Sequence, residues 1–131
     1  MDEPQWIEEQ AVLEIHAIQL EQHGGMTGIR DAGLLSSALN RPRNLWAYAG
    51  QSSDMAAIAA VYAAGIAKNH PFLDGNKRTA AVVCELFLDR NGYELIADND
   101  SWYEAMMGLA SGAIDEAAFQ AWLRDHVVPL G

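Results

Sequence analysis

The sequence contains very little cysteine and few positive charges. Cys84 is the only cysteine among 131 residues, which excludes an intrachain disulfide, and it lies in an apolar run typical of a small core residue. Eight residues are lysine or arginine, whereas 18 are aspartate or glutamate, so the net charge is −10. Because nucleic-acid phosphates attract basic surfaces, this charge argues against direct nucleic-acid binding.

Long hydrophobic runs are also missing. A membrane-spanning helix needs about 20 consecutive apolar residues, and the sequence nowhere contains such a stretch. The first residues are acidic, unlike the basic start of a secretory signal. We therefore expect a cytoplasmic protein without a membrane partner. The length is typical of one domain, which we expect to span residues 1–131.

Half of the residues are hydrophobic, and they recur at helical spacing along most of the chain. The pattern predicts a first helix from Pro4, with Ile7, Ala11, Ile15 and Ile18 on one face. It then predicts a helix capped by Asp31, another capped by Ser53 or Asp54, and two more near residues 99–111 and 115–126. Tyr93–Ala97 is predicted as one short extended segment.

Residues 41–53 show no sustained periodicity and predict a loop, with the preceding helix ending before Pro42. Two interpretations of this loop are open. It is either a flap that aligns a target peptide through Arg41, Trp46 or Tyr48, or an ordinary loop that packs Trp46 on the core.

The most apolar segment runs from Thr79 to Leu88, where Glu85 is the only charge. A helix that is hydrophobic on nearly every side belongs at the centre of a bundle. The sequence therefore predicts an all-α, single-domain helical bundle around this central helix, which we expect to begin near Gly75 and to end at Asn91.

A cluster of specialised polar side chains precedes that helix, within nine residues: His70, Asp74, Asn76, Lys77 and Arg78. Gly75 lets the backbone approach a ligand, and the first turn of the helix offers unpaired N–H groups. A helix N-terminus flanked by glycine and cations is typical of a phosphate site. Cations at this end of a helix are unfavourable unless an anion compensates them, which favours ligand binding by Lys77 and Arg78.

Each side chain of the cluster has a chemical role open to it. Asp74 is able to hold Mg²⁺, because a hard cation prefers carboxylate oxygen, although it is equally able to cap the helix. Lys77 and Arg78 would neutralise charge on a transferred group, and His70 would act as general base because imidazole titrates near neutrality. Asn76 either positions phosphates together with Gly75 or only stabilises the turn. Phe72 is expected to point inward.

Two familiar site types do not match. A P-loop requires G-x-x-x-x-G-K-[ST], whereas His70 stands five residues before Gly75 and Arg78 follows the lysine. A zinc site needs several cysteine or histidine ligands close together, and one cysteine with scattered histidines does not provide them.

The segment His70-Pro-Phe-Leu-Asp-Gly-Asn-Lys-Arg78 closely resembles the Fic-superfamily signature H-x-F-x-[DE]-G-N-[GK]-R, and in particular the death-on-curing (Doc) toxins. Supporting matches lie upstream in His23–Leu35 and at Arg41-Pro42, and downstream at Asn91-Gly92. Fic proteins that transfer AMP usually have a second glycine and a final arginine in this motif. Here Lys77 and Ala81 occupy those positions, as in the Doc pattern.

This resemblance implies transfer of the γ-phosphate of ATP, with Mg²⁺, to a threonine hydroxyl of elongation factor Tu, and so arrest of translation. It places His70, Asp74, Lys77 and Arg78 in catalysis and residues 75–78 in nucleotide binding. It also implies a cognate antitoxin peptide or helix, because the inhibitory motif [ST]-x-x-x-E-[GN] is absent. Two alternatives are AMP transfer to a protein hydroxyl and nucleotide or antitoxin binding without turnover.

Overall fold

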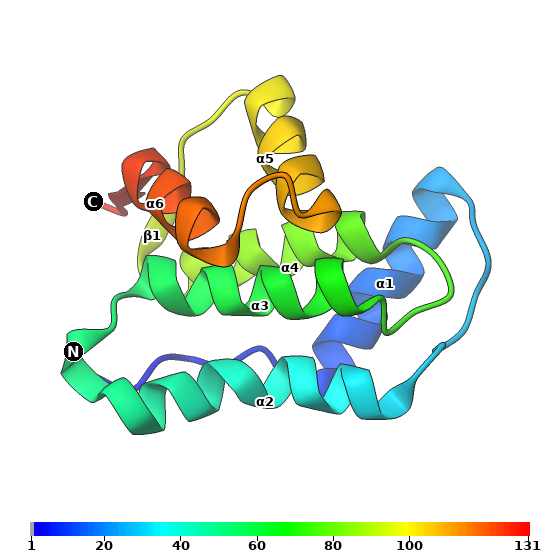
Figure 1. Ribbon diagram of the computed structural model, residues 1–131, viewed down its shortest axis with the longest axis horizontal. Helices are drawn as coiled ribbons and strands as arrows, with labels where there is room; N and C mark the ends of the chain where they lie inside the picture. The colour runs from blue at the N-terminus through cyan, green and yellow to red at the C-terminus, as the bar shows by residue number, and fades with distance from the viewer. Residues whose placement is uncertain (1) are drawn as a thin grey trace.

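The computed structural model describes residues 2–131, except the side chain of Gln51, and consists mainly of helices (Figure 1). In chain order the helices are α1 (Glu9–His23), α2 (Ala32–Ala49), the short 3-10 helix η1 (Gly50–Ser52), α3 (Met55–Asn69), α4 (Asn76–Arg90), α5 (Asn99–Ser111) and α6 (Glu116–His126). The predicted all-α class is confirmed. None of the helices in the described part has an apolar stretch long enough to cross a membrane.

Two short strands form a small antiparallel sheet. β1 (Tyr93–Leu95) pairs with β2 (Val127–Pro129), and Tyr93 lies opposite Pro129 in the register. The predicted extended segment at Tyr93–Ala97 is thus confirmed in its first three residues. Its partner strand at the C-terminal end of the described chain was not predicted.

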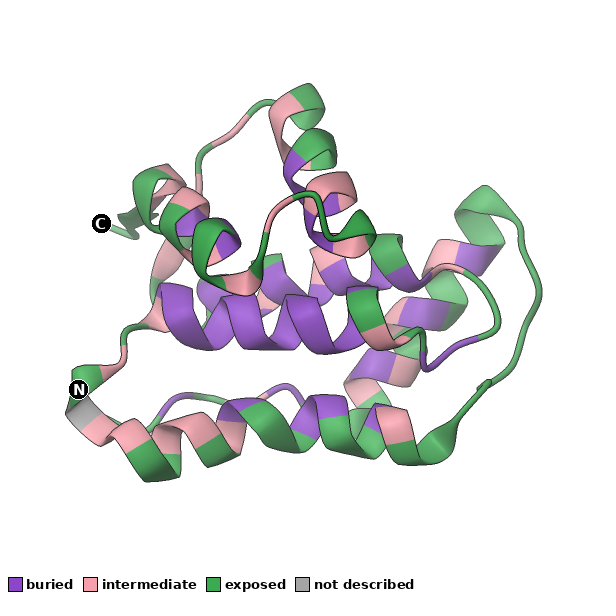
Figure 2. Ribbon diagram, in the orientation of Figure 1, coloured by how far each residue is buried: buried purple, intermediate pink, exposed green. Residues whose placement is uncertain are grey.

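Helix α3 is the most completely buried element. Every residue from Ala56 to Ala67 is buried, and Figure 2 shows this along most of the helix. Its many small residues permit close approach: a Cβ atom added at Gly65 would lie 2.9 Å from the Cβ atom of Ala38 on α2. The sequence predicts α4 at the centre, and α4 does contact α1, α3, α5 and β1. Its exposed residues Lys77, Arg78 and Glu85 leave it less completely buried than α3.

Aspartates begin four of the helices. Asp31 accepts a hydrogen bond from the Leu34 amide at 3.0 Å, and Asp54 accepts one from the Ala57 amide at 2.8 Å, as predicted. Asp98 and Asp115 cap α5 and α6 in the same way. These caps satisfy amide groups that the first turn of a helix leaves unpaired, which explains why the starts of these helices were predictable.

The prediction of a loop at residues 41–53 was wrong, because α2 continues through Pro42 to Ala49. The apolar face formed by Leu35, Ala38 and Leu39 extends through the buried Pro42, and its packing outweighs the hydrogen bond that proline cannot donate. The predicted flap is therefore absent from this segment. Trp46 packs on the core, as the second interpretation of this segment predicted. Arg41 pairs with Glu116 at 3.1 Å, and Tyr48 is 94% exposed.

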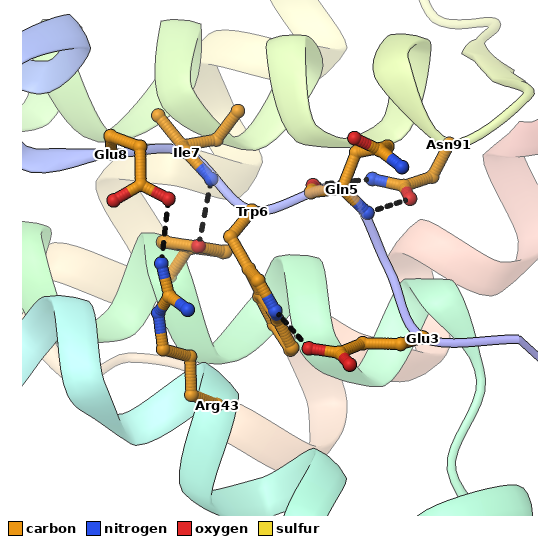
Figure 3. A network of polar contacts seen from close by, with 8 residues as sticks. Glu3, Gln5, Trp6, Ile7, Glu8, Arg43 and Asn91 are labelled. Atoms are coloured by element: carbon orange, nitrogen blue, oxygen red, sulfur yellow. Dashed lines mark hydrogen bonds and ion pairs between the residues drawn. The ribbon is translucent and has the colours of Figure 1, made fainter.

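The prediction of a helix beginning at Pro4 was also wrong. Residues 2–8 form an extended arm, and side chains from the helices bind its backbone (Figure 3). The Ile7 amide donates to the hydroxyl of Tyr62 at 3.1 Å, and the Gln5 backbone exchanges two hydrogen bonds with the amide of Asn91, at 2.7 and 3.0 Å. Arg43 pairs with Glu8 at 2.7 Å and lies 5.3 Å from the ring centroid of Trp6.

Helix α1 therefore begins only at Glu9, and its buried face differs from the predicted one. The buried residues are Val12, His16 and Leu20, whereas Ile18 is exposed. Ala11 and Ile15 of the predicted stripe are partly buried against the core, so the stripe met the edge of the packed face and only Ile18 lies outside it.

Candidate active site

The polar cluster lies in the loop that joins α3 to α4. His70 ends α3 in the left-handed conformation, with φ 51° and ψ 59°, and is the only non-glycine residue with positive φ in the described part of the chain. Gly75, with φ 75°, begins α4. Two left-handed residues thus reverse the chain between two packed helices, and one of them is the histidine predicted to act as base.

The connection between α1 and α2 supports this loop, and the two segments run side by side in Figure 1. The amide of Leu73 donates to the carbonyl of Gly28 at 3.1 Å, and the Arg30 amide donates to the carbonyl of Pro71 at 2.7 Å. The Arg30 guanidinium donates to the His70 carbonyl at 2.6 Å and to the Asn69 carbonyl at 2.7 Å. The backbone around His70 is therefore fixed from outside the motif.

Phe72 anchors the loop in the core, as predicted, with 1% of its surface exposed. The amide side chain of Asn76 closes on the Phe72 backbone: its oxygen accepts from the Phe72 N–H and its nitrogen donates to the Phe72 carbonyl, both at 3.0 Å. Asn76 is buried, and these hydrogen bonds agree with the interpretation that its side chain stabilises the turn. A contact between Asn76 and phosphate stays a prediction.

Asp74 is the only carboxylate that lines the cleft among the described residues. One carboxylate oxygen accepts from the Gly75 amide at 3.0 Å and the other from the Met26 amide at 3.2 Å. α4 begins without a side-chain cap, so Asp74 does not serve the capping role that was its alternative. Each carboxylate oxygen has a further lone pair, and Mg²⁺ commonly binds proteins through one or two carboxylates, completing its shell with water and phosphate.

The loop forms one wall of a cleft of about 600 Å³. All the predicted site residues line it: His70, Asp74, Gly75, Asn76, Lys77 and Arg78. Lys77 and Arg78 are exposed and make no ion pair within the described residues, whereas Arg41, Arg43 and Arg124 all do. Lys68 does not line the cleft. Unpaired cations beside the positive end of a helix are the arrangement that an anionic ligand stabilises.

Helix α5 forms the opposite wall, which the sequence did not reveal as part of the site. Its lining residues are Asn99, Trp102, Tyr103, Met106 and Met107. Their spacing is that of one helical face, which is the signal in the sequence that indicates a shared surface. Tyr103 is 65% exposed in the structure. Trp102 also packs within the domain, because it stacks on Trp122 with ring centroids 5.6 Å apart.

A hydrogen bond ties this wall to α4. The Trp102 indole donates to the Glu85 carboxylate at 2.6 Å. Glu85 is exposed as a residue, but its carboxyl is partly shielded from water, which raises its pKa, and the hydrogen bond from Trp102 opposes that shift. This hydrogen bond connects α5, which forms the second wall of the cleft, to α4.

The fold and the site together define an all-α protein with a cationic cleft at the start of a helix. Comparison with known proteins identifies the family: the model described as "Fic/DOC family" matches residues 6–88. The chain is 30% identical over 118 residues to "Protein kinase doc" of Escherichia phage P1, covering 90% of this chain and 92% of that protein. It is 39% identical over 77 residues to "Toxin Doc" of Mycolicibacterium smegmatis, covering 59% of each.

The chain therefore belongs to the Fic/Doc family, as the motif predicted. The matched region contains the loop and most of α4. Helix α5 lies beyond it, so the second wall of the cleft comes from outside the segment that the family model describes.

Proposed function

We propose that this chain is the toxin of a toxin–antitoxin module and transfers the γ-phosphate of ATP to a threonine hydroxyl of a translation factor, elongation factor Tu by family resemblance. The observation that carries the proposal is the cleft in which a histidine, a carboxylate and two unpaired cations meet at the uncapped start of α4. The relatives named as a kinase and as a toxin support both parts of it.

In the proposed reaction, the phosphates lie against the first turn of α4. Lys77 and Arg78 neutralise their charge, and the amide groups of the helix start donate to their oxygens. Asp74 would hold Mg²⁺, which supplies charge neutralisation at the phosphate oxygens when bound. The apolar wall formed by Trp102 and Met106 suits the flat face of a purine base.

Proton transfer is assigned to His70. It accepts the proton of the substrate hydroxyl as the oxygen forms a bond to the γ-phosphorus. The bond from that phosphorus to the bridging oxygen breaks, and ADP leaves. Arg30 holds the His70 backbone, so the point from which the imidazole projects keeps one position relative to the phosphate site.

Phosphate transfer is favoured over AMP transfer by two residues of the cleft. Lys77 occupies the position where AMP-transferring relatives usually have glycine, and its side chain fills space that glycine would leave open. Ala81 lines the cleft where those relatives usually have arginine, so one cation that would grip the polyphosphate is missing. The same family relationship supports a cognate antitoxin peptide or helix as partner and a cytoplasmic site of action.

The test is a paired assay with Mg²⁺, purified elongation factor Tu and ATP labelled on either the α or the γ phosphate. We expect label only from the γ position, and its loss in His70→Ala. The two lysines of the chain provide a matched control: Lys77→Ala should abolish transfer, whereas Lys68→Ala, outside the cleft, should not.

Other results would contradict specific parts of the proposal. Label from the α position would establish AMP transfer. Activity that persists in His70→Ala would reject this histidine as the base. No label from either position, with Mg·ATP still bound in a titration, would point to another target or to a binding protein without turnover.

A further inference from the structure

We propose that His16, on α1, is a positioning residue for the phosphate site: it holds the Asp74–Gly75 peptide so that the start of α4 presents N–H groups, and no carbonyl, to the bound phosphates. The inference rests on the proposed function, because it concerns the same site. His16 is 58 residues away from Asp74 in sequence and lies outside the motif.

Two contacts join His16 to the loop. Its Nε2 atom lies 2.8 Å from the carbonyl oxygen of Asp74, and its ring stacks on Phe72 with centroids 3.8 Å apart and planes inclined by 9°. Since a carbonyl only accepts hydrogen bonds, Nε2 carries the proton and donates it. His16 is 6% exposed, so water competes little for this bond.

The hydrogen bond determines the direction of a whole peptide unit. In a planar trans peptide the C=O and N–H groups point in opposite directions. With the Asp74 carbonyl turned towards α1, the Gly75 N–H points away from α1 and donates to the Asp74 carboxylate at 3.0 Å. A carbonyl turned the other way would present partial negative charge to the phosphates and repel them.

Because residue 75 is glycine, the orientation of the Asp74–Gly75 peptide needs a contact from outside the loop. Gly75 has no Cβ atom and a φ of 75°, so its own sterics restrict rotation of the preceding peptide very little. The neighbouring helix compensates: a Cβ atom added at Gly75 would lie 3.2 Å from Leu20 and 3.7 Å from the His16 ring. Helix α1 therefore packs directly on the most adaptable point of the loop, and His16 supplies the directional contact there.

Packing alone does not require histidine at this position. The other buried residues of α1, Val12 and Leu20, are aliphatic, and a phenyl ring would stack on Phe72 equally well. Only the N–H group fixes the carbonyl. The two contributions are separable by substitution: His16→Phe keeps a ring and loses the donor, whereas His16→Gln places an amide donor near the position of Nε2 and loses the ring.

The experiment is a calorimetric titration of the full chain with Mg·ATP, combined with thermal unfolding and the amide NMR signal of Gly75. We expect His16→Phe to raise the Kd about tenfold and His16→Gln to restore it to within about threefold, consistent with the loss and return of one buried hydrogen bond. The Gly75 signal should move in His16→Phe and return towards its original position in His16→Gln. Val12→Ala, one turn earlier on the same buried face, should lower the melting temperature without changing the Kd.

The outcomes separate this inference from the function on which it rests. If the parent chain binds Mg·ATP and His16→Phe binds it equally well with an unmoved Gly75 signal, the positioning role is overturned and the proposed function stands. If affinity falls equally in His16→Phe, His16→Gln and Val12→Ala, His16 acts only through stability and the inference fails. If the parent chain does not bind Mg·ATP, the proposed function fails and the inference fails with it.

Discussion

Asn76 connects its own side chain to the backbone of Phe72, four residues earlier in the loop. Replacing it with alanine leaves a buried N–H and a buried C=O of Phe72 without partners. We therefore expect Asn76→Ala to lower the free energy of unfolding by about 2 kcal/mol, measured by urea denaturation. Asn44→Ala, an exposed position on α2, should change it by less than about 0.5 kcal/mol. Unchanged stability combined with weaker Mg·ATP binding would instead indicate direct phosphate contact by Asn76.

Arg30 stabilises His70 in a conformation that non-glycine residues seldom adopt. We expect Arg30→Ala to lower the free energy of unfolding by about 1 kcal/mol, because two carbonyls at the end of α3 lose a charged donor that is partly exposed to water. Phosphate transfer should fall by more than the loss of folded protein explains, because the His70 backbone is no longer held in place. Arg41→Ala removes only a surface ion pair and serves as the control in both assays. Full transfer activity in Arg30→Ala would show that His70 keeps its position without this contact.

The motif could be predicted at the residue scale because its members are close in sequence. His70 to Arg78 are consecutive in the chain, and the turn that gathers them is encoded locally by Gly75 and Asn76. His16 and Arg30 could not be found in this way, because their loop partners are 58 and 40 residues away. A lone histidine on an apolar helical face gives no signal until the opposing loop is known.

Helix starts were predictable where a capping side chain marks them, as Asp31 and Asp54 do. Errors arose where a packing contact outweighs a local preference. Pro42 normally ends a helix, yet the buried face of α2 continues through it. Pro4 favours a helical start, yet the arm obtains its hydrogen bonds from Tyr62 and Asn91 of distant helices. Both outcomes depend on neighbours that a single sequence does not reveal.

The contact between α4 and α5 makes a pH-dependent prediction. In the folded chain, partial shielding of the carboxyl from water raises the pKa of Glu85, so the folded state binds this proton more tightly than the unfolded state does. Below about pH 4 the carboxyl is protonated in both states and does not change the free energy of unfolding. As the pH rises through the raised pKa, ionisation of the carboxyl opposes folding. We expect Glu85→Gln, which can still accept from Trp102, to be more stable than the parent at pH 7 and equal to it near pH 4. Urea midpoints at the two pH values measure this, and lower stability of Glu85→Gln at pH 7 would contradict it.

Charge is distributed unevenly over the whole molecule. The net charge is −10, and three of the eight basic residues form ion pairs with acidic residues in the described part of the chain. Lys77 and Arg78 instead face the cleft. We expect the acidic surface to discourage the binding of polyanions elsewhere and the cleft to attract phosphates. The prediction of no direct nucleic-acid binding, from composition, and the prediction of a phosphate site, from the motif, thus depend on the same charge distribution.

The same excess of negative charge opposes folding, because like charges are brought closer together in the compact state. Salt screens this repulsion over a Debye length that shortens from about 30 Å at 0.01 M to about 8 Å at 0.15 M. We expect sodium chloride over this range to raise the melting temperature by a few degrees, which at this size corresponds to about 1 kcal/mol. Glu104→Gln, which removes one exposed charge, should show a smaller response to salt. A melting temperature that falls with salt would mean that the surface ion pairs, such as Arg124 with Asp54 at 2.8 Å, outweigh the repulsion.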